Sequence, residues 1–483
     1  MNEVVDMLHQ VAMTRPETAA VIDVATGEQI SYATLDSRAT TVSNQLGEHE
    51  VNRTDRIGLR CHRSIETIVQ IHAINRTGAI VVPFDPSLSD ARIESRAKCC
   101  NVSMILDPVD SSAESITVQT YGDSEHGRTV PENEKRDAHS DVRCLLFTSG
   151  TTGKAAPVPL TAQNLETSAW ASALRLGVLP SDRWINPLSL AQMGGIAPIY
   201  RAVHYGTGVI LTPFDQQTIR SAIIDDGGTG ISLVPTMLRK LLDNDVPLDR
   251  CRVVLVGGDR TDPGLVDRSL DQDVPLYVTY GMTEAASQLA TATPSELSND
   301  PTTVGRPLRG TAIRIDKTDE DAVGEILATG RTIAPAAYHD IRVDRVDLNG
   351  TLRTGDSGYR DEDGRLFVTG RLDERIVSGG QTIDPLLVEA RLRDIPLIED
   401  AAVVGIPDDT WGELVAALIQ VDERSKTTIE AVAATVDSKL PSGEKPRRLL
   451  ERSTVPRTPA GTIDRKRVRT LLESADPTEY TIL

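Results

Sequence analysis

Residues 143–157 read RCLLFTSGTTGKAAP, an apolar run that continues into a loop of small and hydroxylated residues. Successive backbone N–H groups in a glycine-rich turn bind anions, and the hydroxyls of Ser and Thr add further donors. The P-loop pattern GxxxxGK requires Ser or Thr after its lysine, but Ala155 follows Lys154 here. The stretch therefore predicts a phosphate-binding loop of another type, with a flexible surface loop as the alternative.

Length and composition limit the class of protein. The chain has 483 residues, which exceeds one ordinary domain. No run approaches the roughly 18 apolar residues of a membrane-spanning helix. The acidic start MNEVVDMLHQ has no long apolar region behind it, so we expect neither membrane insertion nor a signal peptide. The five cysteines form no CxxC pair, which favours buried thiols in a reducing, cytoplasmic environment.

The chain is strongly acidic, with a net charge of −19 and nine lysines against forty-two arginines. Such a charge argues against nucleic acid or an anionic membrane as a partner. An acidic, lysine-poor surface resembles proteins from halophilic organisms, in which high salt screens the repulsion. A genome rich in G and C is the alternative, although codon bias explains the arginines and not the excess of acid.

Alternating strand and helix patterns predict the fold class. Short β-branched runs bounded by Gly or Pro are predicted strands, at residues 19–24, 55–61, 79–85, 142–147, 206–214, 227–235, 251–258 and 274–281. Apolar positions at helical spacing predict helices between them, at residues 37–47, 64–78, 162–177 and 235–245. This order implies mostly parallel sheets covered by helices.

The pattern changes after about residue 370. Predicted helices at 386–395 and 428–440 and strands at 399–407 and 413–421 form a compact α+β unit. We therefore expect a large N-terminal α/β domain, residues 1–371, and a small C-terminal α+β domain, residues 372–483. The polar segment 109–140 is expected to be a surface excursion.

Four further stretches occur with the loop, in a fixed order: VVLVGGD (253–259), VTYGMTEAASQ (278–288), RTGDSGYRDEDGRLFVTGRLDERIVSGG (353–380) and PRTPAGTIDRKRV (456–468). Together they resemble the adenylate-forming superfamily of acyl-CoA and aryl-CoA synthetases, luciferases and peptide-synthetase adenylation domains. The resemblance runs from about residue 15 to about 470. It implies an enzyme that uses ATP and Mg²⁺ to convert a carboxylic acid into an acyl-adenylate.

The resemblance implies a site for the phosphates and the metal. Glu284 would hold Mg²⁺, a hard cation that prefers carboxylate and phosphate oxygens, and Thr283 would contact the α-phosphate. The structural alternative for Glu284 is a charge at a helix N-terminus. The residues implied to surround the β- and γ-phosphates are Thr148, Ser149, Gly150, Thr151, Thr152, Gly153 and Lys154.

The resemblance also implies a site for the nucleoside. Asp356 would accept hydrogen bonds from the ribose hydroxyls, and Arg371 would assist it. Gly257 and Gly258 would let backbone approach the adenine, on which Tyr280 would stack. A turn-forming aspartate is the structural alternative for Asp356.

The same resemblance implies that the C-terminal domain is a mobile lid with a hinge at Arg371-Leu372-Asp373. In one orientation the PRTPAGT loop (456–462) would face ATP. In the other, the loop that contains Gly379 and Gly380 would line a tunnel for coenzyme A. Such a movement would let one site perform two reactions while excluding water.

Within the superfamily, YGMTEAASQLATATP (280–294), TVGRPLRG (303–310), LVPTMLRKLL (233–242) and GIPDDTWGELV (405–415) look most like the o-succinylbenzoate–CoA ligases of menaquinone biosynthesis. A short aromatic keto-diacid needs an apolar pocket with one or two polar anchors. The candidates are Gln192, Gly194, Gly195, Ser287 and Gln288. An aryl- or fatty-acid–CoA ligase, or a nucleotide-binding relative with impaired adenylation, is the alternative.

Three positions depart from the family's pattern. Ala156 occupies a position at which the family usually has a second lysine, and Gln192 replaces a histidine that gates the acid pocket in relatives. Thr462 occupies the position of the adenylation lysine. We therefore expect the catalytic position to involve Thr462 itself or the neighbouring Lys466, whose alternative is a solvated helix end. The oligomeric state is left open, a homo-oligomer included.

Overall fold

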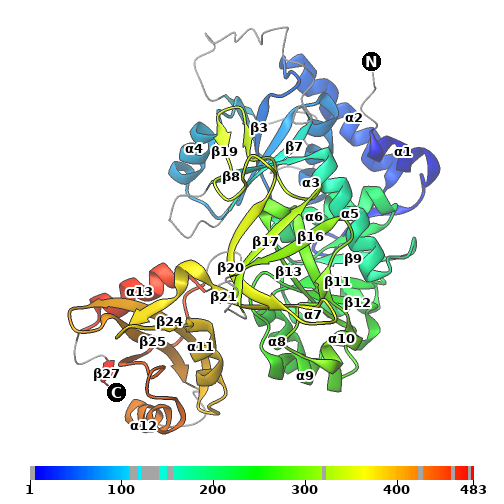
Figure 1. Ribbon diagram of the computed structural model, residues 1–483. Coiled ribbons are helices and arrows are strands. Elements are labelled where there is room, and N and C mark those ends of the chain that lie inside the picture. Colours follow the sequence, from blue (N-terminus) through cyan, green and yellow to red (C-terminus); the bar gives the residue numbers. More distant parts are fainter. Residues whose placement is uncertain are drawn as a thin grey trace. The chain divides into compact units, whose positions relative to one another are not determined.

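The structure is a computed structural model that describes residues 6–108, 118–120, 141–148, 156–317, 323–421, 428–457, 463–476 and 480–482. The chain forms two compact units (Figure 1), Met1–Ile313 with Ala328–Arg353, and Arg314–Leu327 with Thr354–Leu483. The boundary that we expect between residues 371 and 372 stays a prediction. Most of the expected surface excursion at 109–140 lies outside the described residues.

The first unit contains a nine-stranded sheet in the order β15-β14-β13-β12-β11-β9-β10-β1-β2. The six strands from β13 to β1 run parallel to one another, and β14, β15 and β2 are antiparallel to their neighbours. The strands are β1 Ala19–Asp23, β2 Glu28–Ser31, β9 Arg183–Asn186, β10 Gly208–Leu211, β11 Gly230–Leu233, β12 Val253–Val256, β13 Leu276–Met282, β14 Ser287–Ala292 and β15 Arg306–Pro307.

A second sheet of this unit has six strands in the order β6-β5-β3-β4-β7-β8. Its four inner strands are parallel, and β6 and β8 are antiparallel edges. These strands are β3 Arg56–Arg60, β4 Ile80–Phe84, β5 Met104–Leu106, β6 Val118–Thr120, β7 Val142–Phe147 and β8 Pro157–Thr161. A small hairpin follows later in the chain, formed by β18 Ala337–Tyr338 and β19 Ile341–Arg342.

Most helices of the first unit begin at a residue whose side chain accepts a capping hydrogen bond, and several end at left-handed glycines. Thr161 forms a capping box with Asn164 at the start of α5, and Gly177 ends that helix with φ 66°. The helices are α1 Met7–Thr14, α2 Tyr32–Glu48, α3 Ile65–Thr77, α4 Asp90–Cys99, α5 Ala162–Leu176, α6 Met193–Tyr205, α7 Gln216–Ile224, α8 Pro235–Asp243, α9 Pro263–Asp271 and α10 Pro294–Asn299.

Two further sheets have the orders β16-β17-β20-β21 and β23-β22-β25-β26-β27; β24 also pairs with β25. The bounds of the two units run through β16, β17 and β20, and the sheet that contains β22 to β27 belongs to the second unit. The strands are β16 Thr311–Asp316, β17 Gly324–Gly330, β20 Leu352–Arg360, β21 Leu366–Arg371, β22 Ile376–Ser378, β23 Gln381–Ile383, β24 Ile398–Asp408, β25 Gly412–Val421, β26 Arg448–Glu451 and β27 Tyr480–Ile482. The helices are α11 Pro385–Arg393, α12 Ile429–Lys439 and α13 Arg465–Ser474.

Both faces of the β24–β25 pair are buried. Successive side chains of a strand point to opposite faces, so Val403 joins a core with α11 and α12, and its neighbour Val404 joins another with α13. Figure 1 shows α11 and α13 on opposite sides of these strands. This sandwich explains why residues 401–406 are apolar at every position rather than alternating.

The fold class expected from the sequence is confirmed, as are the strand and helix patterns on which it rests. Six helices of the first unit were not predicted: α1, α4, α6, α7, α9 and α10. Helix α6 contains Gly194, Gly195 and Pro198, residues of low helix propensity. Tertiary packing overrides that propensity, because most residues of α6 are buried. Glycine is needed at position 195, since a Cβ there would lie 2.2 Å from the carbonyl oxygen of Ser189.

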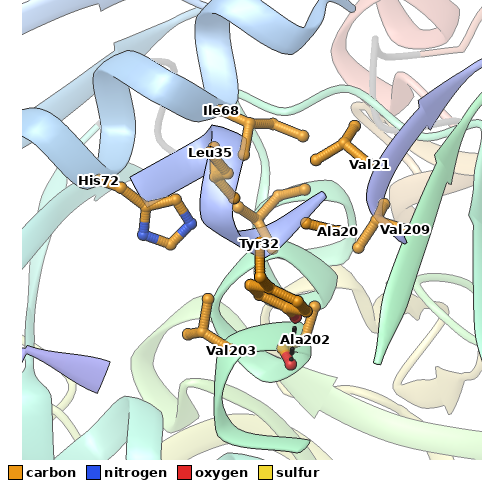
Figure 2. A pocket seen from close by; sticks show the side chains of 10 residues that line it. Ala20, Val21, Tyr32, Leu35, Ile68, His72, Ala202, Val203 and Val209 are labelled. Atoms are coloured by element: carbon orange, nitrogen blue, oxygen red, sulfur yellow. Dashed lines mark hydrogen bonds between the residues drawn. The ribbon is translucent and has the colours of Figure 1, made fainter. Parts of the chain in front are cut away.

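A small cavity of about 10 Å³ lies in the core of the first unit, with room for no more than one water molecule. Figure 2 shows that its lining is apolar apart from His72 of α3 and Tyr32 of α2. The Tyr32 hydroxyl already donates to backbone carbonyl oxygens, those of Ala202 and Thr207. A water needs two to four polar partners, so the cavity is a packing gap and not a ligand site.

His72 is 9% exposed, and burial lowers its pKa to about 4 against the partly opposing charges of Asp6 and Asp36; Arg76 and His204 lower it further. Because this folded-state pKa lies below the ordinary value of 6.5, the unfolded chain binds a proton more readily between pH 6.5 and about 4. The contribution of His72 to stability is therefore complete above pH 6.5 and is lost as the pH falls.

We expect His72→Gln to lose less stability than the wild type between pH 6.5 and 4.5, because the variant has no proton to take up there. Urea unfolding at a series of pH values measures this difference. His49→Gln is the matched control, since His49 is exposed on the surface, and it should follow the wild type. Equal pH dependence in wild type and His72→Gln would contradict the prediction.

Candidate nucleotide and acid site

The predicted phosphate loop joins the two strands of the β7–β8 hairpin. Phe147 pairs with Pro157, and the Thr148 backbone N–H donates to the carbonyl oxygen of Ala156 at 3.0 Å. Both ends of the loop are thus held together, and Ala156 is exposed. The remaining predicted loop residues lie outside the described residues: Ser149, Gly150, Thr151, Thr152, Gly153 and Lys154.

The predicted adenine residues lie at the carboxyl ends of neighbouring parallel strands. Gly257 and Gly258 follow β12, and Tyr280 lies near the end of β13. A Cβ on Gly257 would lie 2.6 Å from Cγ2 of Thr279 and 3.0 Å from the Thr279 carbonyl oxygen. Gly258 has φ 82°, a conformation that favours glycine. The close approach of β13 therefore explains the glycine at position 257, and the positive φ explains the glycine at position 258.

Thr283 and Glu284 lie in a single 3₁₀ turn, Thr283–Ala285, between β13 and β14. The turn is tight, since a Cβ on Gly281 would lie 1.8 Å from the carbonyl oxygen of Ser287. Two consecutive non-glycine residues after the turn have positive φ, 49° at Ala286 and 108° at Ser287. Such backbone costs on the order of 1–3 kcal/mol per residue and is typical of functional sites.

The Glu284 side chain fits a magnesium site. Glu284 is 8% exposed, and its carboxylate forms no hydrogen bond or ion pair among the described residues. A buried carboxylate without a partner is unfavourable unless a cation joins it. No cluster of three or more His, Cys, Asp or Glu side chains suited to a metal occurs in the described ranges. A single carboxylate completed by substrate phosphates is a common arrangement for Mg²⁺.

Two predicted acid-binding residues begin β14, opposite the glutamate turn. Ser287 pairs with Met282 and Gln288 with Gly281. Gln288 is buried, and its amide nitrogen donates to the hydroxyls of Thr291 at 2.9 Å and Thr279 at 3.3 Å. Its Oε1 is buried without a partner in the described chain, so this oxygen is the atom of Gln288 with unused hydrogen-bonding capacity.

The other predicted acid-binding residues begin α6. Gln192 is the N-cap residue, and its side chain forms no capping hydrogen bond. Gly194 is exposed, whereas Gly195 is buried against the backbone of Ser189. Because α6 follows β9, these residues lie beyond the carboxyl end of a strand in the same parallel array as β11, β12 and β13.

In the second unit, the antiparallel pairing of β20 and β21 places Asp356 opposite Arg371. Arg371 Nη1 donates to Asp356 Oδ1 at 3.2 Å, and its Nε and Nη2 donate to Asp373 at 2.9 and 3.1 Å. Burial alone lowers the pKa of Arg371, but Asp373, Asp356 and Glu374 outweigh burial and raise it. The structure thus brings Asp356 and Arg371 together, as the resemblance implies.

Gly379 and Gly380 form the turn of the β22–β23 hairpin, with φ 57° and 81°. The Gly379 N–H donates to the Trp411 carbonyl oxygen at 2.9 Å, and a Cβ on Gly379 would lie 2.7 Å from the Trp411 ring. The Arg447 guanidinium lies 4.1 Å from the centre of that ring. The sequence interpretation missed Trp411 and Arg447, although the tryptophan in GIPDDTWGELV was a signal for a surface aromatic.

Thr462 lies outside the described residues. The neighbouring cations differ in their partners. Arg465 donates to Glu374 and Glu389 and to the carbonyl oxygen of Val403, so it holds the second unit together. Lys466 is exposed on α13, and its ammonium forms no ion pair with any described residue. Among the described residues, Lys466 and the likewise exposed Arg467 are therefore cations beside that loop whose charges are not committed to an ion pair.

Two family models match the chain: "AMP-binding enzyme" over residues 8–338 and "AMP-binding enzyme C-terminal domain" over residues 387–462. The first match alone covers more than half of the chain. The chain belongs to the AMP-binding enzyme family. The resemblance to adenylate-forming enzymes is thereby confirmed.

Several curated relatives of this family match over their full length. The 2-succinylbenzoate–CoA ligase of Bacillus anthracis (strain A0248) is 29% identical and covers 98% of this chain and 99% of its own length. The enzyme of the same name from Bacillus cytotoxicus (strain DSM 22905) is also 29% identical, over 98% of this chain and 100% of its own.

Two solved structures of o-succinylbenzoate–CoA synthetase from Bacillus subtilis share the fold. The complex with the acyl-adenylate intermediate has a TM-score of 0.84 and 26% identity, covering 98% of each chain. The complex with ATP and magnesium ion has a TM-score of 0.82 and 25% identity, covering 97% of this chain and 99% of the other. Among the described residues, no helix has the length and apolar character needed to cross a membrane.

We expect Gly257→Ala to destabilise the first unit by about 1–3 kcal/mol, because its methyl group would overlap Thr279 on the adjacent strand. It should also weaken ATP binding, measured by titration calorimetry alongside urea unfolding. Gly47→Ala is the control, since a Cβ at this exposed position of α2 would meet no atom within 4 Å. Stability of Gly257→Ala at or above that of Gly47→Ala would refute the packing argument.

Proposed function

We propose that this chain is an ATP-dependent ligase that joins 2-succinylbenzoate to coenzyme A through an acyl-adenylate. The observation that carries the proposal is the full-length similarity to 2-succinylbenzoate–CoA ligases. Support comes from the first unit, where the predicted adenine and metal residues and the start of α6 follow strands of one parallel array, and Ser287 and Gln288 begin the antiparallel strand next to it. Ligands of open α/β sheets bind at the carboxyl ends of such strands.

In the first reaction, a carboxylate oxygen of the acid attacks the α-phosphorus of ATP, and the bond to pyrophosphate breaks. Glu284 holds Mg²⁺, which neutralises phosphate charge when bound. Thr283 contacts the α-phosphate, while backbone at Gly257 and Gly258 and the ring of Tyr280 receive the adenine. The loop from Thr148 to Lys154 surrounds the outer phosphates.

Asp356 accepts hydrogen bonds from the ribose hydroxyls, and Arg371 orients the Asp356 carboxylate. The hydrogen bond at 3.2 Å uses Oδ1 of Asp356, and an ionised carboxylate has further acceptor positions. Arg371 also bonds to Asp373, so one guanidinium connects the ribose site to the residues after β21. This arrangement supports a hinge at Arg371-Leu372-Asp373 and a lid over residues 372–483.

The acid binds between the start of α6 and the start of β14. Gln192 and Ser287 offer polar side chains there, Gln288 offers its unpaired Oε1, and Gly194 and Gly195 leave space. One carboxylate of the substrate reacts, and its second carboxylate takes a polar anchor from this group. Such a division between an apolar pocket and few polar anchors is typical of small-molecule sites.

In the second reaction, the thiol of coenzyme A attacks the acyl carbon, its proton passes to solvent, and AMP leaves. Gly379 and Gly380 line the path of coenzyme A in this half of the cycle. Thr462 occupies the position of the family's adenylation lysine, so this chain lacks the positive charge of that lysine. The charge of Lys466 compensates for this loss during adenylation. The five free thiols favour a reducing cytoplasm as the location.

Two further functions remain as alternatives: ligation of another aryl or fatty acid, and nucleotide binding with impaired adenylation. We expect AMP release from ATP, Mg²⁺ and coenzyme A to be fastest with 2-succinylbenzoate in a panel that includes benzoates and fatty acids. Liquid chromatography of AMP and the acyl-CoA measures this. Turnover only with another acid would overturn the substrate, and ATP binding without AMP release from any acid would overturn the ligase.

We expect Asp356→Ala to weaken the use of ATP by on the order of 1–3 kcal/mol, because the ribose hydroxyls lose a charged acceptor. Steady-state kinetics with ATP as the varied substrate measure it, and the KM for the acid should change little. Asp363→Ala is matched in charge and lies exposed after β20 on the same hairpin, so it should resemble the wild type. An unaltered ATP dependence in Asp356→Ala would remove this residue from the site.

A further inference from the structure

Large apolar side chains are exposed around the ends of α1, α5 and α6 in the first unit. Trp170 and Leu174 lie one turn apart on α5 and are 48% and 63% exposed. Met13 of α1 and Leu179 of the loop after α5 are 71% and 45% exposed. Single exposed apolar residues are common on proteins, but a contiguous group of them marks an interaction surface.

The Trp170 ring is held in place from the protein side. It lies against the rings of His204 and Tyr205 at the end of α6, with centroid distances of 6.5 and 6.2 Å. The Tyr205 hydroxyl donates to the carbonyl oxygen of Ala169, the residue before Trp170. A ring that is fixed before binding loses little conformational entropy when a partner covers it. Tryptophan is also enriched among the residues that dominate the energy of interfaces.

Arg15 connects the end of α1 to the same surface. Its Nη1 donates to the carbonyl oxygens of Gly206, directly after α6, at 3.0 Å and of Pro180 at 3.1 Å. Met13 lies two residues before Arg15, and Leu179 lies one residue before Pro180. The exposed apolar residues of α1, α5 and the loop after α5 therefore form one surface, the α5 patch, beside the end of α6 (Figure 1).

Two charged side chains lie at opposite ends of the α5 patch. Glu166 is exposed one turn before Trp170 and forms no ion pair with any described residue. Arg15 lies at the other end, beside the loop after α5, where its described bonds are to carbonyl oxygens and not to an acid. An acid at one end and a cation at the other make the patch complementary to a copy of itself turned end for end.

We propose that the α5 patch is the interface of a homodimer, with a two-fold axis that passes between Trp170 and Leu174. A two-fold interface joins the same patch of both chains, so that each contact occurs twice. With the two α5 helices antiparallel about this axis, Trp170 packs on the partner's Leu174. Glu166 then lies opposite the start of the partner's loop after α5, where the partner's Arg15 is bound.

Other occupants fit the α5 patch less well. An anionic membrane or a nucleic acid would meet the carboxylate of Glu166 on a chain with a net charge of −19. A second copy of the chain supplies the cation that Glu166 lacks. Two copies also repel each other over longer distances because of their net charge, and salt screens this repulsion. The association is therefore measured at raised ionic strength.

The first test is sedimentation velocity of the full chain in about 0.5 M KCl, at concentrations up to about 100 μM. We expect the wild type to dimerise as its concentration rises. Trp170→Ser and Leu174→Ser should each raise the Kd of the dimer roughly 10- to 100-fold, the range for truncating a central interface residue. Leu348→Ser is the control, since Leu348 is 90% exposed in the first unit but outside the α5 patch, and it should dimerise like the wild type.

A charge exchange tests the two-fold geometry. Glu166→Arg places a cation against the partner's Arg15, and Arg15→Glu places an acid against the partner's Glu166, so each variant alone should dimerise more weakly. In an equimolar mixture of the two variants both contacts join opposite charges, and a heterodimer should form with a Kd close to that of the wild type. Urea unfolding checks that Arg15→Glu is folded; if it is not, Arg15→Gln takes its place and should restore part of the affinity.

A wild type that stays monomeric over this range would refute the dimer. A Kd that is the same in the wild type, Trp170→Ser and Leu174→Ser would place the interface elsewhere, and a mixture of the charge variants that stays monomeric would refute the two-fold pairing. Binding of a monomeric wild type to vesicles of zwitterionic or anionic phospholipid, lost in Trp170→Ser, would assign the patch to a membrane instead. None of these measurements uses a substrate, so their outcome is independent of the proposed function.

Discussion

The parallel pairing of β9, β11, β12 and β13 is the constraint on which the candidate site of the first unit depends. Parallel strands end at the same edge of a sheet, so the segments that follow them are brought close although they are distant in the sequence. Gly257 and Glu284 thereby follow adjacent strands, β12 and β13, and the start of α6 follows β9, which is separated from β12 by β11 in the same parallel array. A different strand order would separate these residues without altering any of them.

Close backbone approach is the second determinant of the site. Gly257 and Gly281 each occupy a position where a Cβ would overlap a neighbouring strand. The space these glycines leave lets β12, β13 and β14 lie close together beside the glutamate turn. The strain is then concentrated at Ala286 and Ser287, where hydrogen bonds from the surrounding helices and strands can hold it. The close packing at Gly257 and Gly281 and the backbone strain at Ala286 and Ser287 are therefore separate features of the same edge of the sheet.

Sequence patterns predicted those elements whose side chains carry a clear periodicity. Residues 64–78 show helical spacing of apolar side chains, and α3 lies there. Helix α6 was not predicted because Gly194, Gly195 and Pro198 lower its helix propensity, although most of its residues are buried in the folded chain. Family resemblance supplied the candidate nucleotide residues, but spacing alone does not reveal the pairing of Asp356 with Arg371, which depends on the register of β20 and β21.

The sequence also does not show that Arg201 of α6 is buried. A single arginine among apolar residues of a helix usually extends its charged end to solvent, and its burial depends on the packing of α5 against α6. Gln288 stays a predicted acid-binding residue, and the sequence does not show that hydroxyls of Thr279 on β13 and Thr291 on β14 hold its amide nitrogen. The role of Gln288 remains a prediction, since the fold determines where this residue lies and not what it binds.

The two hydrophobic cores on either face of β24 and β25 have a consequence for how the protein unfolds. Both cores are composed of residues of the second unit, so that unit contains the apolar contacts of an independent folding unit. Denaturation then need not be a single all-or-none event, and a melting temperature measured by one probe would describe only the unit that this probe reports.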